Sequence, residues 1–159
     1  MQTLKGRVGG TLQGFDVRLE VNQTQVRGRV GGASSGADVH LEGVPGGVSG
    51  RIGGAVLGFD VVGILEPNRI KVRLGGDGVG QTLTLERVQD EFKGRFGGPH
   101  DGKDVHLKVS RGRLEGRISG ASIGKDVQLE GDASAEWAAL IAVVTYKLLE
   151  DAKTASGSG

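Results

Sequence analysis

The chain contains no cysteine, only three prolines and only one long apolar run in 159 residues. The lack of cysteine excludes disulfide scaffolds and cysteine-based zinc or iron–sulfur sites. Low proline together with 36% hydrophobic residues argues against a disordered chain. The apolar run, Ala135 to Leu149, is shorter than the roughly 20 residues that cross a bilayer. The first residues contain no apolar stretch of signal-peptide length, so we expect a cytoplasmic location.

Net charge is close to zero, with 20 basic and 19 acidic side chains. This balance argues against a dedicated nucleic-acid binder, and no nucleic-acid partner is expected. Glycine is abundant, with 31 residues, but the glycines do not recur at every third position. A collagen-like chain is therefore excluded.

An internal repeat dominates the sequence. An arginine recurs at intervals of 22 residues, at positions Arg7, Arg29, Arg51, Arg73, Arg95 and Arg117. Around it the pattern is apolar-x-Gly-Arg-apolar-Gly-Gly, three variable residues, then Gly-x-Asp-Val-x-Leu. The fourth unit diverges most, with Val72 in place of the first glycine and Thr82 in place of the aspartate. Six matches in register indicate six copies of one structural unit.

Each unit contains two stretches in which apolar and polar residues alternate, which is typical of β-strands. In the first unit, Phe15, Val17 and Leu19 alternate with Asp16 and Arg18. A short loop bounded by glycines separates the two stretches, so each unit is predicted to be an antiparallel hairpin. Six hairpins give twelve strands, with one apolar face and one charged face exposed to water.

The apolar segment near the C-terminus is predicted to be a helix that begins after Ser134 and ends at about residue 152. Its apolar residues cover almost the whole circumference, and such a helix is buried on all sides. A glycine also recurs on the inward face of the first strand, as Gly6, Gly28, Gly50, Gly94 and Gly116. We interpret these glycines as making room for the helix inside a closed twelve-stranded barrel. Residues 1–153 form this single domain, and residues 154–159 are expected to be a flexible tail.

A six-coil β-solenoid capped by the helix is the alternative fold, because glycine-rich repeats of similar length occur there. A capping helix would have only one apolar face, which favours the barrel.

The six-hairpin barrel with its hydrophobic C-terminal helix, centred on Ala135 to Leu149, resembles the tubby C-terminal, LURP-one-related and phospholipid-scramblase superfamily. The resemblance covers nearly the whole chain and is one of architecture. It implies a non-enzymatic protein that recognises acidic lipid headgroups.

Catalytic and metal-binding patterns are weak. The repeated arginines and aspartates are predicted to form charge pairs on the outer face. His40 and His106 occupy equivalent outward positions in different units, and His100 lies in a loop. The sequence around Gly75–Gly78 offers too few oxygen ligands for calcium. We therefore predict no enzyme, no metal and no cofactor.

Basic residues are concentrated between Phe92 and Leu114. The candidate anion- or lipid-binding residues are Lys93, Arg95, Lys108, Arg111 and Arg113. The predicted function is a binding module that recognises acidic lipid headgroups or other anions, with an anionic membrane surface as the partner.

The alternative is a structural or protein-interaction barrel. Val62 and Ile64 occupy positions where outward, polar residues are expected, and Leu12, Val56, Leu57 and Ile123 lie at loop tips. These apolar residues are the candidate contact with a protein partner.

Overall fold

The computed structural model contains twelve β-strands followed by one helix, as the repeat predicts. It describes residues 2–10, 14–22, 24–32, 36–53, 58–75, 80–97, 102–119 and 125–157. The elements are β1 (Gln2–Gly9), β2 (Gly14–Val21), β3 (Gln25–Gly31), β4 (Gly36–Val44), β5 (Gly47–Gly53), β6 (Gly58–Glu66), β7 (Arg69–Leu74), β8 (Gln81–Val88), β9 (Glu91–Gly97), β10 (Lys103–Ser110), β11 (Arg113–Ser119), β12 (Lys125–Gly131) and α1 (Ala135–Gly157).

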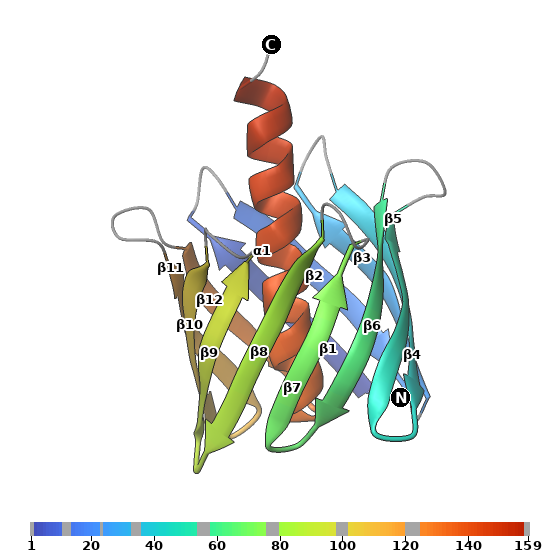
Figure 1. Cartoon of the computed structure of the whole chain (residues 1–159), viewed down its shortest axis with the longest axis vertical. Coiled ribbons are helices and arrows are strands. Elements are labelled where there is room, and N and C mark those ends of the chain that lie inside the picture. The colour runs from blue at the N-terminus through green and yellow to red at the C-terminus, as the bar shows by residue number, and fades with distance from the viewer. Residues whose placement is uncertain are drawn as a thin grey trace.

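The sheet closes on itself (Figure 1). Each strand pairs antiparallel with the next, and β1 pairs with β12, where Leu4 lies opposite Gly131 and Val8 opposite Val127. Closure leaves no unpaired edge strand. The predicted barrel is confirmed. The solenoid alternative is wrong, because in a solenoid each repeat contacts only its neighbours and the first and last strands would not pair.

Alternating residues explain which face of the sheet is buried. In β2, Phe15, Val17 and Leu19 point inward and are buried, whereas Asp16 and Arg18 are exposed. The same alternation holds around the ring, so the inner wall is a continuous apolar surface. An apolar wall of this kind needs an apolar filling.

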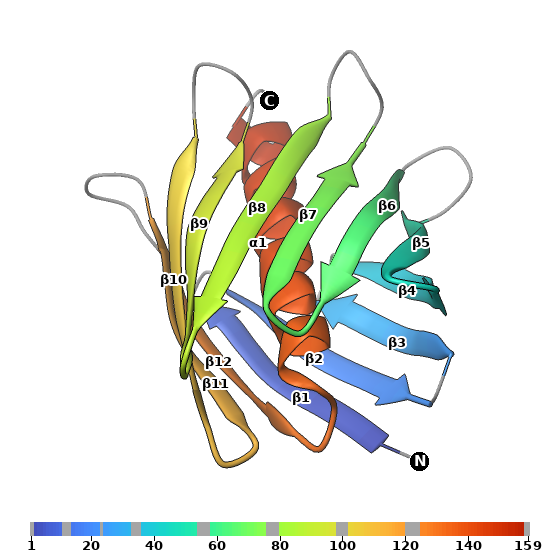
Figure 2. The ribbon, with the colours of Figure 1, turned by 60° about the horizontal axis from the view of Figure 1, so that its bottom comes forward.

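Helix α1 fills the barrel (Figure 2). Ala139 to Val144 are fully shielded from solvent. The buried hydroxyl of Thr145 donates to the Ile141 carbonyl at 2.7 Å. At the open end, the Nζ atom of Lys147 lies 3.0 Å from Gln81 Oε1 and 3.1 Å from Asp151 Oδ2, which satisfies this nearly buried cation.

The helix runs further than the sequence indicates. It starts at Ala135, directly after Ser134 as expected, but continues to Gly157 and projects beyond the strand ends (Figure 1). Residues 154–157 are thus helical rather than part of a tail, because no glycine or proline interrupts the chain before Gly157. Of the described residues, none belongs to a helix that is long and apolar enough to cross a membrane.

The recurring inward glycines have a different role from the one expected. A Cβ atom at Gly94 would overlap the carbonyl oxygen of Thr84 in β8, and one at Gly6 would overlap the carbonyl oxygen of Gln128 in β12. Gly6 also has a φ of 150°, which L-residues rarely adopt. The interpretation that these glycines make room for the helix is therefore wrong: they allow the neighbouring strand to approach closely. Such glycines let a sheet bend enough to close.

Candidate functional site on the outer wall

Because α1 occupies the interior, the outer wall and the barrel ends are the surfaces most open to a ligand. A cavity of about 80 Å³ lies between the start of α1 and strands β11 and β12, and it is lined mainly by leucine and alanine. Engineered protein cavities that bind benzene are about twice this size. This cavity is too small for a lipid headgroup.

The arginine of each repeat lies directly opposite the residue nine positions later. Arg7 contacts Asp16 at 2.8 Å, Arg51 contacts Asp60 at 2.9 Å, and Arg117 contacts Asp126 at 2.7 Å. Two more aspartate pairs complete the set of five salt bridges: Arg29–Asp38 and Arg95–Asp104. In the fourth unit, Arg73 donates to the Thr82 hydroxyl at 2.9 Å instead. The predicted outer charge pairs are confirmed.

This pairing removes Arg95 from the free cations of the candidate patch. Its guanidinium lies 3.0 Å from Asp104. Arg95 also lies near the end of β9 that is distant from the β10–β11 turn, where Arg111 is located. Of the five candidates, Arg95 is thus the least available for an external anion.

Lys93 belongs to a small charged cluster with Glu91 and His106. The His106 ring nitrogen Nε2 lies 2.7 Å from Glu91 Oε1, and the Lys93 ammonium is 4.0 Å from the other carboxylate oxygen. The hydrogen bond with His106 and, to a smaller extent, the charge of Lys93 lower the pKa of the Glu91 carboxyl. Glu91 thus stays ionised and partly neutralises this cluster.

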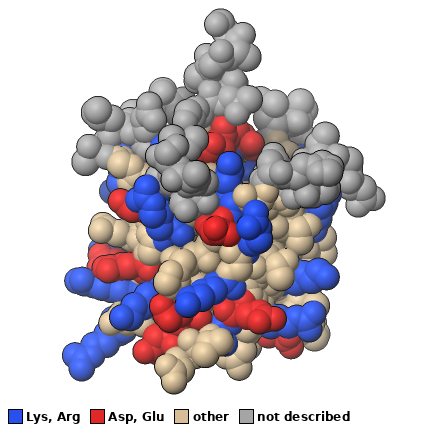
Figure 3. Space-filling view, turned by 60° about the vertical axis from the view of Figure 1, so that its left-hand side comes forward, with Lys and Arg blue, Asp and Glu red and all other residues tan. Residues whose placement is uncertain are grey.

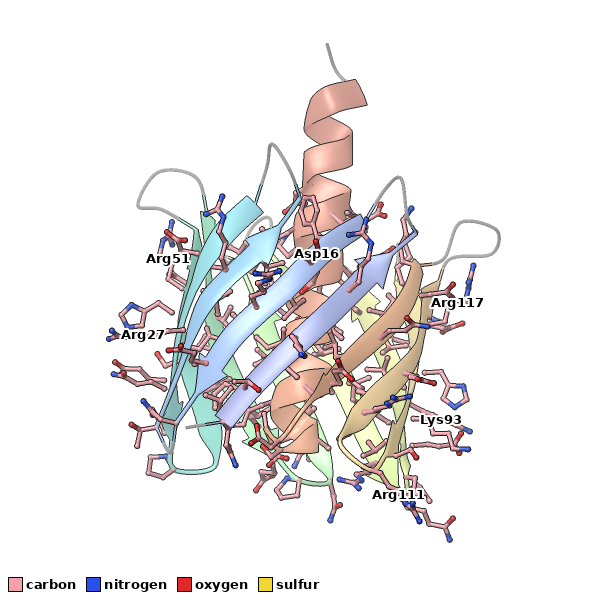
Figure 4. All side chains as sticks on the ribbon, turned by 180° about the vertical axis from the view of Figure 1, so that it is seen from behind. Asp16, Arg27, Arg51, Lys93, Arg111 and Arg117 are labelled. Atoms are coloured by element: carbon pink, nitrogen blue, oxygen red, sulfur yellow. The ribbon has the colours of Figure 1, made fainter. Side chains whose placement is uncertain are left out.

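Lys108, Arg111 and Arg113 are brought together near the turn between β10 and β11. Arg111 and Gly112 have φ angles of 42° and 79°, the left-handed pair typical of a tight hairpin turn. All three cations are exposed, and none forms an ion pair or hydrogen bond with another described residue. Lys93, Arg111 and other cations of this wall are visible in Figure 4.

Acidic side chains are interspersed with these cations. Glu91 and Glu115 lie on either side of Lys108 in the strand register, and Glu130 lies opposite Arg113. Figure 3 shows basic and acidic atoms mixed over this face. The basic residues predicted from the sequence are therefore most concentrated at the turn between β10 and β11.

A second group of cations lies across β1, β2 and β3 and was missed by sequence reasoning. Lys5, Arg18 and Arg27 line one hollow in the outer wall. They are separated by up to 22 positions in the chain, so a scan for local charge excess does not find them. The signal available in the sequence was the repeat itself, because Lys5 and Arg27 occupy equivalent positions in successive units.

The apolar candidates are partly exposed. Val62 points outward with 54% of its surface accessible, and Ile64 on the same strand is half-buried. Val44, also exposed, lies opposite Gly47, which in turn lies opposite Ile64. The four loop-tip candidates, Leu12, Val56, Leu57 and Ile123, and His100, lie outside the described residues.

Metal ligands are not grouped on the described part of the chain: no cluster of three or more His, Asp or Glu side chains there is placed to hold an ion. His40 and His106 both lie on the outer wall, on β4 and β10.

Comparison with known proteins gives no match to any protein-family model, to any curated protein or to any solved structure.

Proposed function

We propose that this protein is a non-enzymatic binding module that recognises acidic lipid headgroups through its outer wall, at the turn between β10 and β11. The observation that carries the proposal is the grouping of Lys108, Arg111 and Arg113, three exposed cations whose side chains form no ion pair or hydrogen bond among the described residues. Each basic group near an anionic membrane contributes about 1 kcal/mol of binding free energy. Lys93 extends this surface along β9, while Arg95 contributes less because Asp104 neutralises it.

The architecture supports the proposal in a second way. With α1 in the barrel, the outer wall and the loops remain for recognition. Arg111 and Arg113 are both exposed at this turn, which suits contact with a membrane surface.

Sedimentation with vesicles tests this proposal. Vesicles of phosphatidylcholine with phosphatidylserine are mixed with the wild type, with the triple variant Lys93→Glu, Arg111→Glu and Arg113→Glu, and with a control triple variant Arg51→Glu, Arg69→Glu and Lys71→Glu. Both variants change the net charge equally. We expect the wild type and the control to bind at low salt, and the first triple variant to lose binding.

Binding should weaken as salt rises, because surface charges are screened over a Debye length of about 10 Å at 0.1 M. No binding by the wild type at low salt, or equal binding by both triple variants, would contradict the proposal.

A protein-interaction role is the second candidate, and one observation favours it. At the position of Val62 the other units carry Arg18, His40, Thr84, His106 and Gln128, and at the position of Ile64 they carry charged residues. The third unit thus replaces two polar positions with an exposed apolar strip. If this strip is the contact, a Val62→Lys, Ile64→Glu variant should lose association with a partner, and salt should have little effect.

A further inference from the structure

A hollow in the outer wall over β1, β2 and β3 carries an unusual charge arrangement. Its polar lining consists of Thr3, Lys5, Arg18, Glu20 and Arg27, and Gly28 lies on its floor. Gly28 has a φ of 151°, and a side chain there would collide with the backbone of β2. The hollow is thus built by the same close strand approach that curves the barrel.

Arg18 is the centre of this arrangement. It lies directly opposite Lys5 on β1 and directly opposite Arg29 on β3. Among the strand pairings of the described residues, these are the two places where Lys or Arg faces Lys or Arg. Like charges directly opposite each other destabilise a sheet.

The neighbours of Arg18 have other contacts, whereas Arg18 has none. Arg29 forms its salt bridge with Asp38 at 3.2 Å, and Lys5 lies 4.0 Å from Glu130. Arg27 makes only a long contact of 3.4 Å with the His40 ring. Within the described residues, the Arg18 guanidinium has no ion pair and no hydrogen bond.

The other repeats act as internal controls. A comparable hollow over β4, β5 and β6, with Gly50 in its lining, has one Lys or Arg side chain, Arg51, and this arginine is paired with Asp60. The other charged residues of its lining are Asp38 and Glu42. At the position of Lys5 the other units carry Arg27, Ser49, Lys71, Lys93 and Glu115, and at the position of Arg18 they carry neutral residues or histidine. Three Lys or Arg side chains therefore meet at one hollow because Arg18 departs from the repeat, whereas Lys5 and Arg27 occupy a position that is basic in most units.

We infer that the hollow over β1–β3 binds a phosphate monoester group, with Arg18 as the central ligand and Lys5 and Arg27 on either side. A phosphate monoester carries about −1.5 to −2 charge at pH 7 and offers three acceptor oxygens. Three cations and Glu20 leave a net charge of +2 in the hollow. The guanidinium of Arg18 can donate two parallel hydrogen bonds to such an oxyanion, and the bound group would separate three repelling cations.

The test is a nuclear magnetic resonance titration of the labelled full chain with inorganic phosphate, against sodium chloride of equal ionic strength. We expect saturable shifts of the Lys5, Arg18, Arg27 and Gly28 amides. Arg18→Gln should weaken binding by roughly tenfold or more, as expected for loss of hydrogen bonds to a charged group. The control is Lys71→Gln. Lys71 occupies the position equivalent to Lys5 but lies opposite Thr84 instead of an arginine, so this variant should leave the affinity for phosphate unchanged.

Thermal melting checks that Arg18→Gln still folds. Phosphate should raise the melting temperature of the wild type and not that of Arg18→Gln, whereas without phosphate the variant should melt no lower than the wild type. Shifts that do not saturate, or equal effects of Arg18→Gln and Lys71→Gln, would overturn the inference.

Vesicles containing phosphatidic acid distinguish a lipid source of the phosphate from a soluble one. If the headgroup of a lipid is bound, these vesicles still bind the variant Lys93→Glu, Arg111→Glu, Arg113→Glu, which lacks the proposed β10–β11 surface. Free phosphate then competes, and adding Arg18→Gln to this variant abolishes both vesicle and phosphate binding. If a soluble ester is bound, phosphate titrates the hollow and vesicle binding does not depend on Arg18. The variant Lys93→Glu, Arg111→Glu, Arg113→Glu should keep the phosphate shifts, so this site and the proposed β10–β11 surface succeed or fail separately.

Discussion

Gly63 of β6 lies directly opposite Val72 of β7, and this pair reverses the arrangement at the five other junctions between repeats. At each of those junctions a leucine of one repeat faces a glycine of the next. The pairs are Leu19–Gly28, Leu41–Gly50, Leu85–Gly94, Leu107–Gly116 and Leu129–Gly6. The third unit lacks this leucine and the fourth lacks this glycine, so the two departures from the repeat compensate each other. Every junction keeps one glycine and one bulky side chain.

This reversal predicts a strong coupling between the two positions. Gly63→Leu should destabilise the barrel, because a Cβ atom at Gly63 would overlap the Lys71 carbonyl oxygen, and overpacking costs about 1–3 kcal/mol. Val72→Gly should also destabilise it, by a few kcal/mol, because a fully buried side chain is lost.

The double variant Gly63→Leu, Val72→Gly recreates the leucine–glycine pair of the other junctions. We expect it to be more stable than either single variant, with a coupling free energy of at least about 1 kcal/mol in chemical denaturation. Additive losses in the double variant would show that the two residues do not compensate each other.

Gly94 should tolerate no side chain. Because the backbone of β8 lies where its Cβ would be, both Gly94→Ala and Gly94→Leu should lower the melting temperature, the leucine variant by several degrees. Lys93→Leu, at the exposed neighbouring position, is the matched control and should change stability little. If Gly94→Ala melts like the wild type, the close strand approach at this junction is incorrect.

Because of Tyr146, we expect the free energy of unfolding to fall at alkaline pH. Burial inside the barrel and, to a smaller extent, the charge of Glu150 raise the pKa of the Tyr146 phenol from 10.0 to about 12. In the unfolded chain the phenol releases its proton near pH 10, so between pH 10 and 12 the folded state binds more protons and the free energy of unfolding falls.

The chain has a single tyrosine, so the ultraviolet absorbance of tyrosinate follows this group directly. We expect a midpoint near 12 in the folded protein and near 10 in denaturant. Tyr146→Phe should reduce the fall in stability over this interval. A native midpoint near 10 would mean that the ring is solvated.

The sequence was sufficient to predict the hairpins, the barrel and the buried helix. Alternation within each unit fixes which side chains face inward, and the all-round apolar character of α1 indicates burial. Pairing between units was less accessible, because it depends on which residue of one repeat lies opposite which residue of the next. For this reason the sequence predicts the inward position of Gly94 but not its role, because it does not show that Leu85 lies opposite Gly94.

The outer wall shows the same limit. Sequence proximity groups Arg95 with the free cations, because it does not show the contact of Arg95 with Asp104. It does not group Lys5 with Arg18, because these two residues come together only through the register of β1 and β2. Charges on a sheet surface are therefore best judged by cross-strand neighbours, which require the register.

The chain's own helix, α1, forms the core of the barrel. Amide hydrogen exchange of the intact protein tests this arrangement most directly, because Ala139 to Val144 are completely shielded from solvent. Their amides should exchange only through global unfolding, with protection equal to the free energy of unfolding measured in denaturant. Exchange of these amides by local opening, well below that free energy and independent of the strands, would show that α1 leaves the barrel and would contradict the account.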